Sequence, residues 1–323
     1  MDSIPSILNQ FKDKQVLIIG DAMIDAYMWG NIHRMSPEAP VPVVDIEKRE
    51  SRLGGAANVA LNIQSLGATP LLFSAIGNDH YGDVFCMLME KQKLSCEGLQ
   101  KLNDRNTTVK TRIISDNKHV LRVDEENTKP ITENSIIVEL EKLIRSKKFD
   151  VLVFEDYNKG LLTETLIQKA IKIAIELNIP TIVDPKKDNF FAYQGVDIFK
   201  PNLKEIKEGL GVEFVVTSEN ELSENVNIVL EKLNAKGILL TLSEHGIYFQ
   251  NKTKSFKQRA YKRNIVDVSG AGDTVVSVAA LALACNLDNE QLMRIANLAG
   301  GLVCEKVGVV PILTEDLLNA TNN

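Results

Sequence analysis

The chain has 323 residues and a mass of 35.8 kDa, enough for one large α/β domain or for two smaller domains with a sizeable core. Hydrophobic residues make up 44% and charged residues 25%, as in ordinary soluble globular proteins. The net charge of −6 and the pI near 5.4 provide no basic face for nucleic acid or an anionic membrane, so we expect neither as a partner.

Targeting signals and zinc-binding patterns are absent from the sequence. The stretch Val275–Cys285 is apolar but is interrupted by Ser277, and it is much shorter than the roughly 20 residues of a membrane helix. The N-terminal residues lack the basic start, apolar core and cleavage site of a signal peptide. The cysteines and histidines show no zinc spacing, and the thiols are scattered. We therefore expect a cytoplasmic protein.

Short apolar runs recur along the chain, each followed by a polar loop and in most cases by a helical pattern. Because they are rich in Val, Ile and Leu without alternation, they are typical of strands buried on both faces. Strands that alternate with helices predict a mostly parallel sheet covered on both sides. The runs are QVLIIG (15–20), DVLVFEDY (150–157), IPTIVD (179–184), VDIFK (196–200) and KGILLTL (236–242).

Two regions alternate apolar and polar residues instead. Pro40–Glu50 and the pair Thr107–Ser115 and Lys118–Asp124 are typical of half-exposed antiparallel strands, with a turn expected at Asp116–Asn117. Asp21–Gly30 is a candidate for one more strand. Together, about residues 21–50 and 107–124 predict a small β lid within a single domain that spans residues 1–323. Its apolar face must cover a substrate cleft or a second subunit.

Polar side chains gather where the predicted strands end. Ligands of open α/β sheets bind beyond the carboxyl ends of the strands, so these side chains predict a site there. Each alone is more often a solvated loop residue, but so many at one edge favours function. The residues are Asp21, Asp25, Asp156, Lys159, Asp184, Lys186, Asn202, Glu205 and Asp273.

The motif DVSGAGDT (267–274) combines two glycines and a carboxylate directly before an apolar helix. Gly270 and Gly272 permit a tight turn with exposed N–H groups, and the helix N-terminus adds partial positive charge, which makes an anion site. A dinucleotide-binding turn is disfavoured because Val275 stands at its third glycine position and Asp273 would repel a pyrophosphate. We favour phosphoryl transfer, with Asp273 taking the proton of the attacking hydroxyl. A helix cap at Asp273 is the simpler alternative.

Two further motifs allow both a functional and a structural interpretation. Gly54–Gly55 precede a helix with Asn58 off its apolar stripe, and they serve either the close approach of a ligand or close packing on the sheet. Asn202 and Glu205 stand at i and i+3 at a helix start. They suit either a hydrated Mg²⁺ carried by nucleotide phosphates or a capping box.

The sequences GGAANVALNIQSLGA and DVSGAGDT resemble the two signatures of the PfkB (ribokinase-like) family of sugar kinases, and the likeness extends from about Val16 to Pro311. The resemblance implies an α/β fold, a ribokinase-like three-layer sandwich with a mostly parallel central sheet and a β lid. It also implies ATP with Mg²⁺ as the donor and direct transfer to a sugar hydroxyl.

The resemblance also implies roles for individual residues. The catalytic base is Asp273, with an anion hole on Gly270, Ala271 and Gly272. The segment Asn202, Leu203, Lys204 and Glu205 lies near the ATP phosphates, with Asn202 and Glu205 near the metal. Ser243, Gly246 and Asn297 border the nucleotide. The sugar site contains Asp25, Gly54, Gly55, Asn58, Arg112 and Lys159.

Within the family, SPEAPVPVV (36–44), EDYNKG (155–160) and PNLKE (201–205) resemble the heptose 7-phosphate kinases. The resemblance implies D-glycero-β-D-manno-heptose 7-phosphate as the acceptor, phosphorylated at its anomeric hydroxyl. It also implies a role in forming the ADP-heptose precursor of lipopolysaccharide. Leu53 departs from the proline of that subgroup. The chain ends soon after the kinase region, which predicts a separate nucleotidyltransferase downstream.

A phosphorylated acceptor requires cationic side chains, and a homodimer through the lid is expected. The candidates for the cationic pocket are Arg52, Lys110, Arg112, Arg122 and Lys159, and Lys159 is the best placed because it follows a strand end. Two alternatives remain. One is another PfkB-type kinase for a different sugar or nucleoside. The other is a sugar-binding protein without catalysis, which would be expected to lose the base or the glycines.

Overall fold

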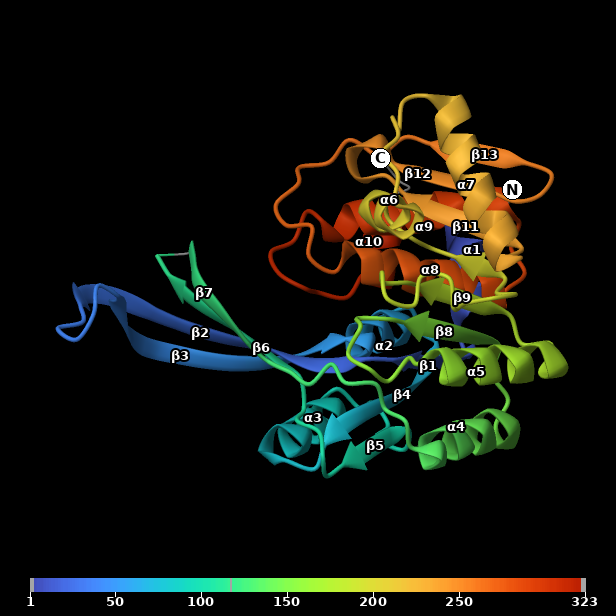
Figure 1. The fold of residues 1–323 in the computed structure, drawn as a ribbon. Helices are drawn as coiled ribbons and strands as arrows, with labels where there is room; N and C mark the ends of the chain where they lie inside the picture. Colours follow the sequence, from blue (N-terminus) through green and yellow to red (C-terminus); the bar gives the residue numbers. More distant parts are fainter. Residues whose placement is uncertain (1–2, 117, 321–323) are drawn as a thin grey trace.

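The computed structural model describes residues 3–116 and 118–320, and its largest element is a nine-stranded sheet (Figure 1). Its strands run parallel from β5 to β11, whereas β12 and β13 are antiparallel to their neighbours. In spatial order the strands are β13 (Ser255–Gln258), β12 (Ile247–Gln250), β11 (Gly237–Thr241), β10 (Ile198–Phe199), β9 (Thr181–Asp184), β8 (Val151–Glu155), β1 (Gln15–Gly20), β4 (Thr69–Gly77) and β5 (Leu99–Leu102).

Helices cover both faces of this sheet. Strand β1 shows why, since Val16 and Ile18 belong to one buried cluster and Leu17 and Ile19 to the other. One cluster takes residues from α1 (Ile4–Phe11), α2 (Ala56–Ser65), α3 (His80–Lys91), α8 (Ala271–Ala284), α9 (Asn289–Val303) and α10 (Thr314–Asn319). The other takes residues from α4 (Asn134–Ser146), α5 (Glu164–Leu177), α6 (Leu203–Leu210) and α7 (Glu219–Leu233). The predicted three-layer sandwich with a mostly parallel sheet is confirmed.

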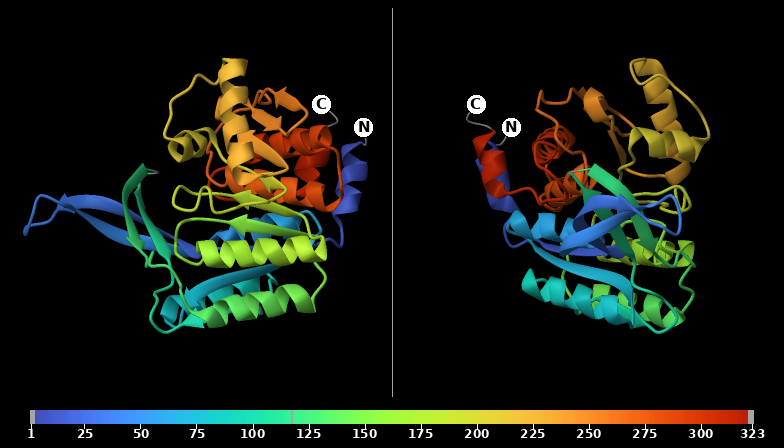
Figure 2. Two further views of the ribbon diagram at one scale, coloured as in Figure 1. Left: turned by 45° about the vertical axis from the view of Figure 1, so that its right-hand side comes forward. Right: turned by 90° about the vertical axis from the view of Figure 1, so that its left-hand side faces the viewer.

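A second sheet of four strands projects from the body of the molecule (Figures 1 and 2). Its spatial order is β3 (Pro42–Gly55), β2 (Ala22–Met35), β6 (Val109–Ser115) and β7 (Lys118–Glu125), and we call it the lid. The strands lie close to the ranges expected from alternation, but β2 and β3 are longer. Of the turn expected after β6, Asp116 has a left-handed φ of 50°, and Asn117 lies outside the described residues.

The register of the lid strands separates charged from apolar side chains. Residues two apart on a strand share a face, and directly paired residues lie on the same face. On one face, Asp25 pairs with Arg52 and Lys110, and Tyr27 pairs with Glu50 and Arg112. Ile24 pairs with Leu53 and Val109 on the other, and that face continues through the pairs Thr111–Val123 and Ile113–Leu121. The lid therefore has a charged face and an apolar face.

Apolar side chains of the lid remain exposed to solvent. Leu121 is 55% and Val123 41% exposed on the apolar face, and Met35 and Val41 are exposed near the far end of the lid. Among the residues that the structure describes, no helix combines the length and the apolar character needed to cross a membrane.

Candidate active site

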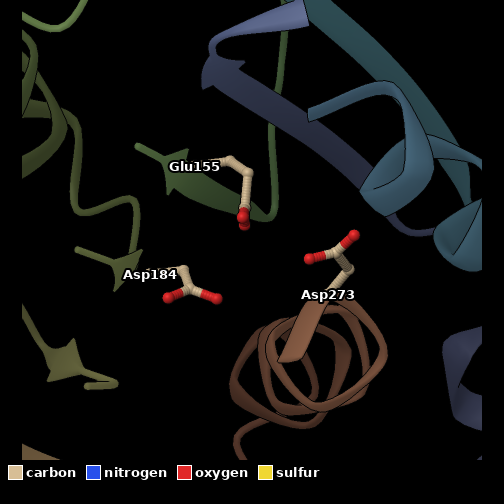
Figure 3. A group of neighbouring side chains, drawn as sticks. All are labelled: Glu155, Asp184 and Asp273. Atoms are coloured by element: carbon tan, nitrogen blue, oxygen red, sulfur yellow. The ribbon is translucent and has the colours of Figure 1, made fainter. Parts of the chain in front are cut away.

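Carboxylates from two neighbouring strands and one helix meet at the carboxyl edge of the central sheet (Figure 3). Glu155 ends β8, Asp184 ends β9, and Asp273 is the third residue of α8. One oxygen from each of the three lies within 4.8 Å of the others. A Cβ atom built on Gly272 would lie 3.6 Å from Asp184 Oδ2, so the N-terminus of α8 is directed at this cluster. The edge predicted to hold the site therefore brings these acids together.

Asp273 is buried and its carboxylate is held by two donors. The amide of Asn58 donates to Oδ2 at 2.6 Å, and the hydroxyl of Tyr157 donates to Oδ1 at 2.9 Å. The alternative of a simple helix cap does not describe this geometry, because the N-cap residue is Gly270. Burial raises the pKa of Asp273 to about 6, and the hydrogen bond from Asn58 opposes the rise. The hydrogen bonds from Asn58 and Tyr157 favour the ionised form, which a general base requires.

The turn before α8 requires glycine at its N-cap position, Gly270. Gly270 has a left-handed φ of +78°, and a Cβ atom there would approach Val309 Cγ1 at 3.1 Å, which favours glycine. The first N–H groups of a helix have no acceptor within it. The N–H of Ala271 is directed at the carbonyl of Val268 at 3.3 Å. An anion hole at Gly270, Ala271 and Gly272 stays a prediction.

Glu155 belongs to the carboxylate cluster but was not predicted from the sequence as a site residue. It closes the apolar strand VLVFE and is 0% exposed, and neither carboxylate oxygen has a hydrogen-bond partner among the described residues. Burial, followed by the charges of Asp184 and Asp273, raises the pKa of Glu155 well above its ordinary value. Such an orphaned buried carboxylate is costly unless a ligand completes it.

Two lysines offset part of the negative charge. Lys200 is 2% exposed and its ammonium lies 2.9 Å from Asp184 Oδ2, while Lys186 lies 3.8 Å from Asp184 Oδ1 and contacts Glu205. Four carboxylates, those of Glu155, Asp184, Glu205 and Asp273, thus surround two ammonium groups. A hard divalent cation suits the remaining charge and the oxygen donors, so these residues fit Mg²⁺.

Asn202 and Glu205 form a capping box, as the structural interpretation of this motif predicted. Asn202 Oδ1 accepts from the N–H of Glu205 at 2.9 Å, and Glu205 Oε2 accepts from the N–H of Asn202 at 2.8 Å. Leu203 and Lys204 begin α6, where Lys204 is exposed beside Glu208. A role for this segment near ATP or the metal stays a prediction. Lys186 connects it to the carboxylate cluster through Glu205.

The residues assigned to the nucleotide border one loop. A Cβ atom on Gly246, whose φ is +90°, would lie 2.0 Å from the carbonyl oxygen of Gln258. Asn297 on α9 donates to the carbonyl of Arg259 at 2.9 Å. Ser243 begins the short 3₁₀-helix η1 (Ser243–His245) just before Gly246. Gly246 and Asn297 thus lie next to the segment 258–260, and the contact of these three residues with the nucleotide stays a prediction.

The paired glycines before α2 are required by packing. A Cβ atom on Gly54 would lie 2.3 Å from Asp25 Oδ2, and one on Gly55, whose φ is +58°, would lie 2.4 Å from the carbonyl oxygen of Asp21. The packing interpretation therefore accounts for the pair. It also brings the backbone against Asp25, which accepts a hydrogen bond from Arg112 Nη1 at 2.5 Å.

The chain matches the family model described as "pfkB family carbohydrate kinase" over residues 13–316. The chain belongs to the PfkB family. It is a phosphotransferase that uses an alcohol group as acceptor.

Relatives support the assignment. The chain is 35% identical over 322 residues to the bifunctional protein HldE of Syntrophotalea carbinolica, covering 98% of this chain and 65% of the relative. It is 40% identical over 300 residues to HldE of Aliarcobacter butzleri, covering 92% and 62%. The chain thus spans less than two thirds of the length of these curated relatives.

Solved structures share the fold at low sequence identity. Phosphofructokinase-2 from Escherichia coli in complex with potassium has a TM-score of 0.77 at 17% identity, covering 95% of this chain and 97% of the other. Ribokinase from Arabidopsis thaliana, complexed with ribose and ATP, has a TM-score of 0.74 at 17% identity, covering 95% and 98%. The fold of this kinase is therefore ribokinase-like.

Replacing the proposed base should stop turnover without unfolding the kinase. We expect Asp273→Asn to lower kcat by roughly 10²–10⁴-fold, because the asparagine amide cannot take the proton of the acceptor. The fold should survive, since the Asn58 amide can turn to present its oxygen. Steady-state kinetics and melting temperature measure both effects. Tyr157→Phe, which leaves the carboxylate, should lose less, and near-wild-type turnover in folded Asp273→Asn would remove Asp273 from the mechanism.

The orphaned carboxylate of Glu155 should reduce the stability of the metal-free kinase. We expect Glu155→Gln to raise its free energy of unfolding at neutral pH by about 1–3 kcal/mol, because Glu155 must take up a proton on folding or bury an unpartnered charge, whereas glutamine is neutral in both states. Denaturant titration without metal measures this gain. Exposed Glu224→Gln is the control. Added Mg²⁺ should stabilise the wild type more than Glu155→Gln, and an equal effect on both would exclude Glu155 as a ligand.

Proposed function

We propose that this kinase transfers the γ-phosphoryl group of ATP to the anomeric hydroxyl of D-glycero-β-D-manno-heptose 7-phosphate, giving the 1,7-bisphosphate. The observation that carries the proposal is the 35–40% identity to proteins named HldE over 92–98% of this chain, in the region that holds the heptose-kinase motifs. The product would enter ADP-heptose and lipopolysaccharide precursor synthesis. Catalysis would take place in one kinase domain in the cytoplasm.

The chemistry follows from the surroundings of Asp273. The acceptor hydroxyl would lie against its carboxylate and give up its proton as the hydroxyl oxygen attacks the γ-phosphorus and the bond to the ADP oxygen breaks. Asn58 and Tyr157 keep the carboxylate in one orientation from opposite sides, so little reorganisation is needed. The N–H groups at the start of α8 would hold the charge on the transferring group.

Magnesium would be held on the same side of the sheet. Glu155 and Asp184 are the carboxylates best suited to it, and Glu205 and Asn202 would lie nearer the ATP phosphates. The ion would neutralise charge on the phosphates. Lys186 and Lys200 offset part of the negative charge of the cluster.

The apolar face of the lid supports a homodimer. Leu121 and Val123 are exposed there, and a face of this kind is normally covered by a partner. The Ser36–Val44 motif lies at the connection between β2 and β3, at the far end of the lid (Figure 1). This position is better suited to subunit contact than to contact with the sugar of its own chain.

A panel of acceptors tests the substrate. With MgATP, we expect ADP production to be fastest with D-glycero-D-manno-heptose 7-phosphate and to yield a product phosphorylated at C1 in the β configuration, identified by NMR. The unphosphorylated heptose, fructose, ribose, tagatose phosphate and a nucleoside are the comparison. Faster turnover with any of these would overturn the substrate assignment, while the family and the phosphotransferase activity would stand.

The dimer is tested at the apolar face. We expect the wild type to behave as a dimer in analytical ultracentrifugation and Leu121→Glu to dissociate, because a charge would be buried at the interface without a partner. Val138→Glu, a change at an exposed position of α4, is the matched control and should stay dimeric. A monomeric wild type, or a dimer unaffected by Leu121→Glu, contradicts the lid interface.

A further inference from the structure

Three cations on the charged side of the lid are paired with three carboxylates. Arg112 pairs with Asp25 at 2.5 Å, Lys110 with Asp124 at 3.0 Å, and Lys159 with Glu126 at 2.9 Å. Both lysine side chains are 15% exposed, so these are not ordinary surface charges. Lys110 and Arg112 come from β6, whereas Lys159 comes from the loop after β8. The cluster therefore spans the junction between the lid and the central sheet.

Glu126 differs from the other two acids because one of its oxygens serves two lysines. Oε2 lies 2.9 Å from the Lys159 ammonium and 3.3 Å from that of Lys110. Partial burial would raise the pKa of Glu126, but the two ammonium groups hold it below its ordinary value. An anionic oxygen between two ammonium groups is the arrangement that a phosphate oxygen would adopt there.

The backbone around this pair is fixed by a buried arginine. Arg105 is 8% exposed, and its guanidinium donates to the carbonyls of Lys159, Asn127 and Lys129. It therefore joins the loop of Lys159 to the segment that follows Glu126. Since this anchoring uses backbone carbonyls, the Glu126 side chain can turn toward solvent while the two lysines keep their places.

The two lysines belong to segments that also carry residues of the proposed active site. Lys159 is two residues after Tyr157, so the Cα atoms of Tyr157 and Lys159 are at most about 7.6 Å apart. The hydroxyl of Tyr157 donates to Asp273. Lys110 is the direct cross-strand partner of Asp25 on the charged face. An acceptor with its hydroxyl at Asp273 can therefore carry its other end toward Lys110 and Lys159.

We propose that Lys110 and Lys159 form the subsite for a phosphate monoester on the acceptor, and that Glu126 occupies this subsite in the ligand-free chain. The proposal rests on the proposed function and specifies its substrate class. A phosphate dianion brings more charge and more acceptor oxygens than one carboxylate, so it displaces Glu126. A neutral sugar leaves Glu126 in place. Glu126 thus acts as a specificity residue against unphosphorylated sugars.

Phosphate binding tests the subsite without requiring turnover. Inorganic phosphate is titrated by calorimetry into the wild type, Glu126→Gln, Lys159→Ala and the double variant. Glu126→Gln removes the competing charge at nearly constant volume, so we expect phosphate to bind about two- to fivefold more tightly. Glu125→Gln makes the same change one residue earlier and should bind like the wild type. The double variant should lose the gain.

The outcomes separate this proposal from the proposed function. If the Glu126→Gln effect equals that of Glu125→Gln, Glu126 does not occupy the subsite. If the gain persists after Lys159→Ala, the phosphate binds elsewhere, for instance at the N-terminus of α8, and the proposal is wrong. Because only binding is measured, tight phosphate binding in Glu126→Gln supports the subsite even if heptose 7-phosphate proves not to be the acceptor. Melting temperatures verify that each variant is folded.

Discussion

The buried carboxylate of Asp21 is the constraint on which the arrangement of the site depends. It is the single residue between β1 of the central sheet and β2 of the lid. Its side chain accepts from the N–H groups of Tyr157, Lys159 and Leu161 at 2.9, 3.0 and 3.4 Å. Its backbone bonds to Glu155 and Ala56. Burial and the charge of Asp156 raise the pKa of Asp21 to about 6, and the three N–H donors oppose the rise. One residue thereby fixes the lid, the loop 157–161 and the start of α2 relative to one another.

The loop held by Asp21 carries Tyr157, which contacts the proposed base, and Lys159, which contacts Glu126 next to the lid. Tyr157 reaches Asp273 on the side of the base, and Lys159 reaches Glu126 on the side of the lid. Arg105 holds the same loop through the carbonyl of Lys159. A hydroxyl at the base and an anionic group at the lysines are therefore recognised by one rigid segment, so positioning in this kinase is a property of the loop rather than of single side chains.

The sequence was sufficient for the features that depend on local patterns. The unbroken apolar runs predicted the buried strands, alternation predicted the lid, and glycines marked the turn before α8. The partners of Asp273 could not be derived in this way, because Asn58 is 215 residues away and Tyr157 is 116 residues away. Glu155 and Lys200 were missed because each follows an apolar run at the end of a strand. The sequence alone does not show whether a charged residue at that position is buried or exposed to water. Glu126 was missed because its role depends on two lysines from separate elements.

The buried carboxylates that suggest catalysis also lower the stability of the ligand-free protein. Glu155, Asp184 and Asp273 are all buried at the edge of a well-packed sheet, and only part of their charge is offset by Lys186 and Lys200. A chain selected for stability alone would place apolar side chains here, since replacing buried ions by such residues is often neutral or stabilising. The lid differs, because its half-buried cations Arg52, Lys110 and Arg112 each have a carboxylate partner. The central cluster is therefore built to be completed by a cation, whereas the lysine subsite is built to exchange one anion for another.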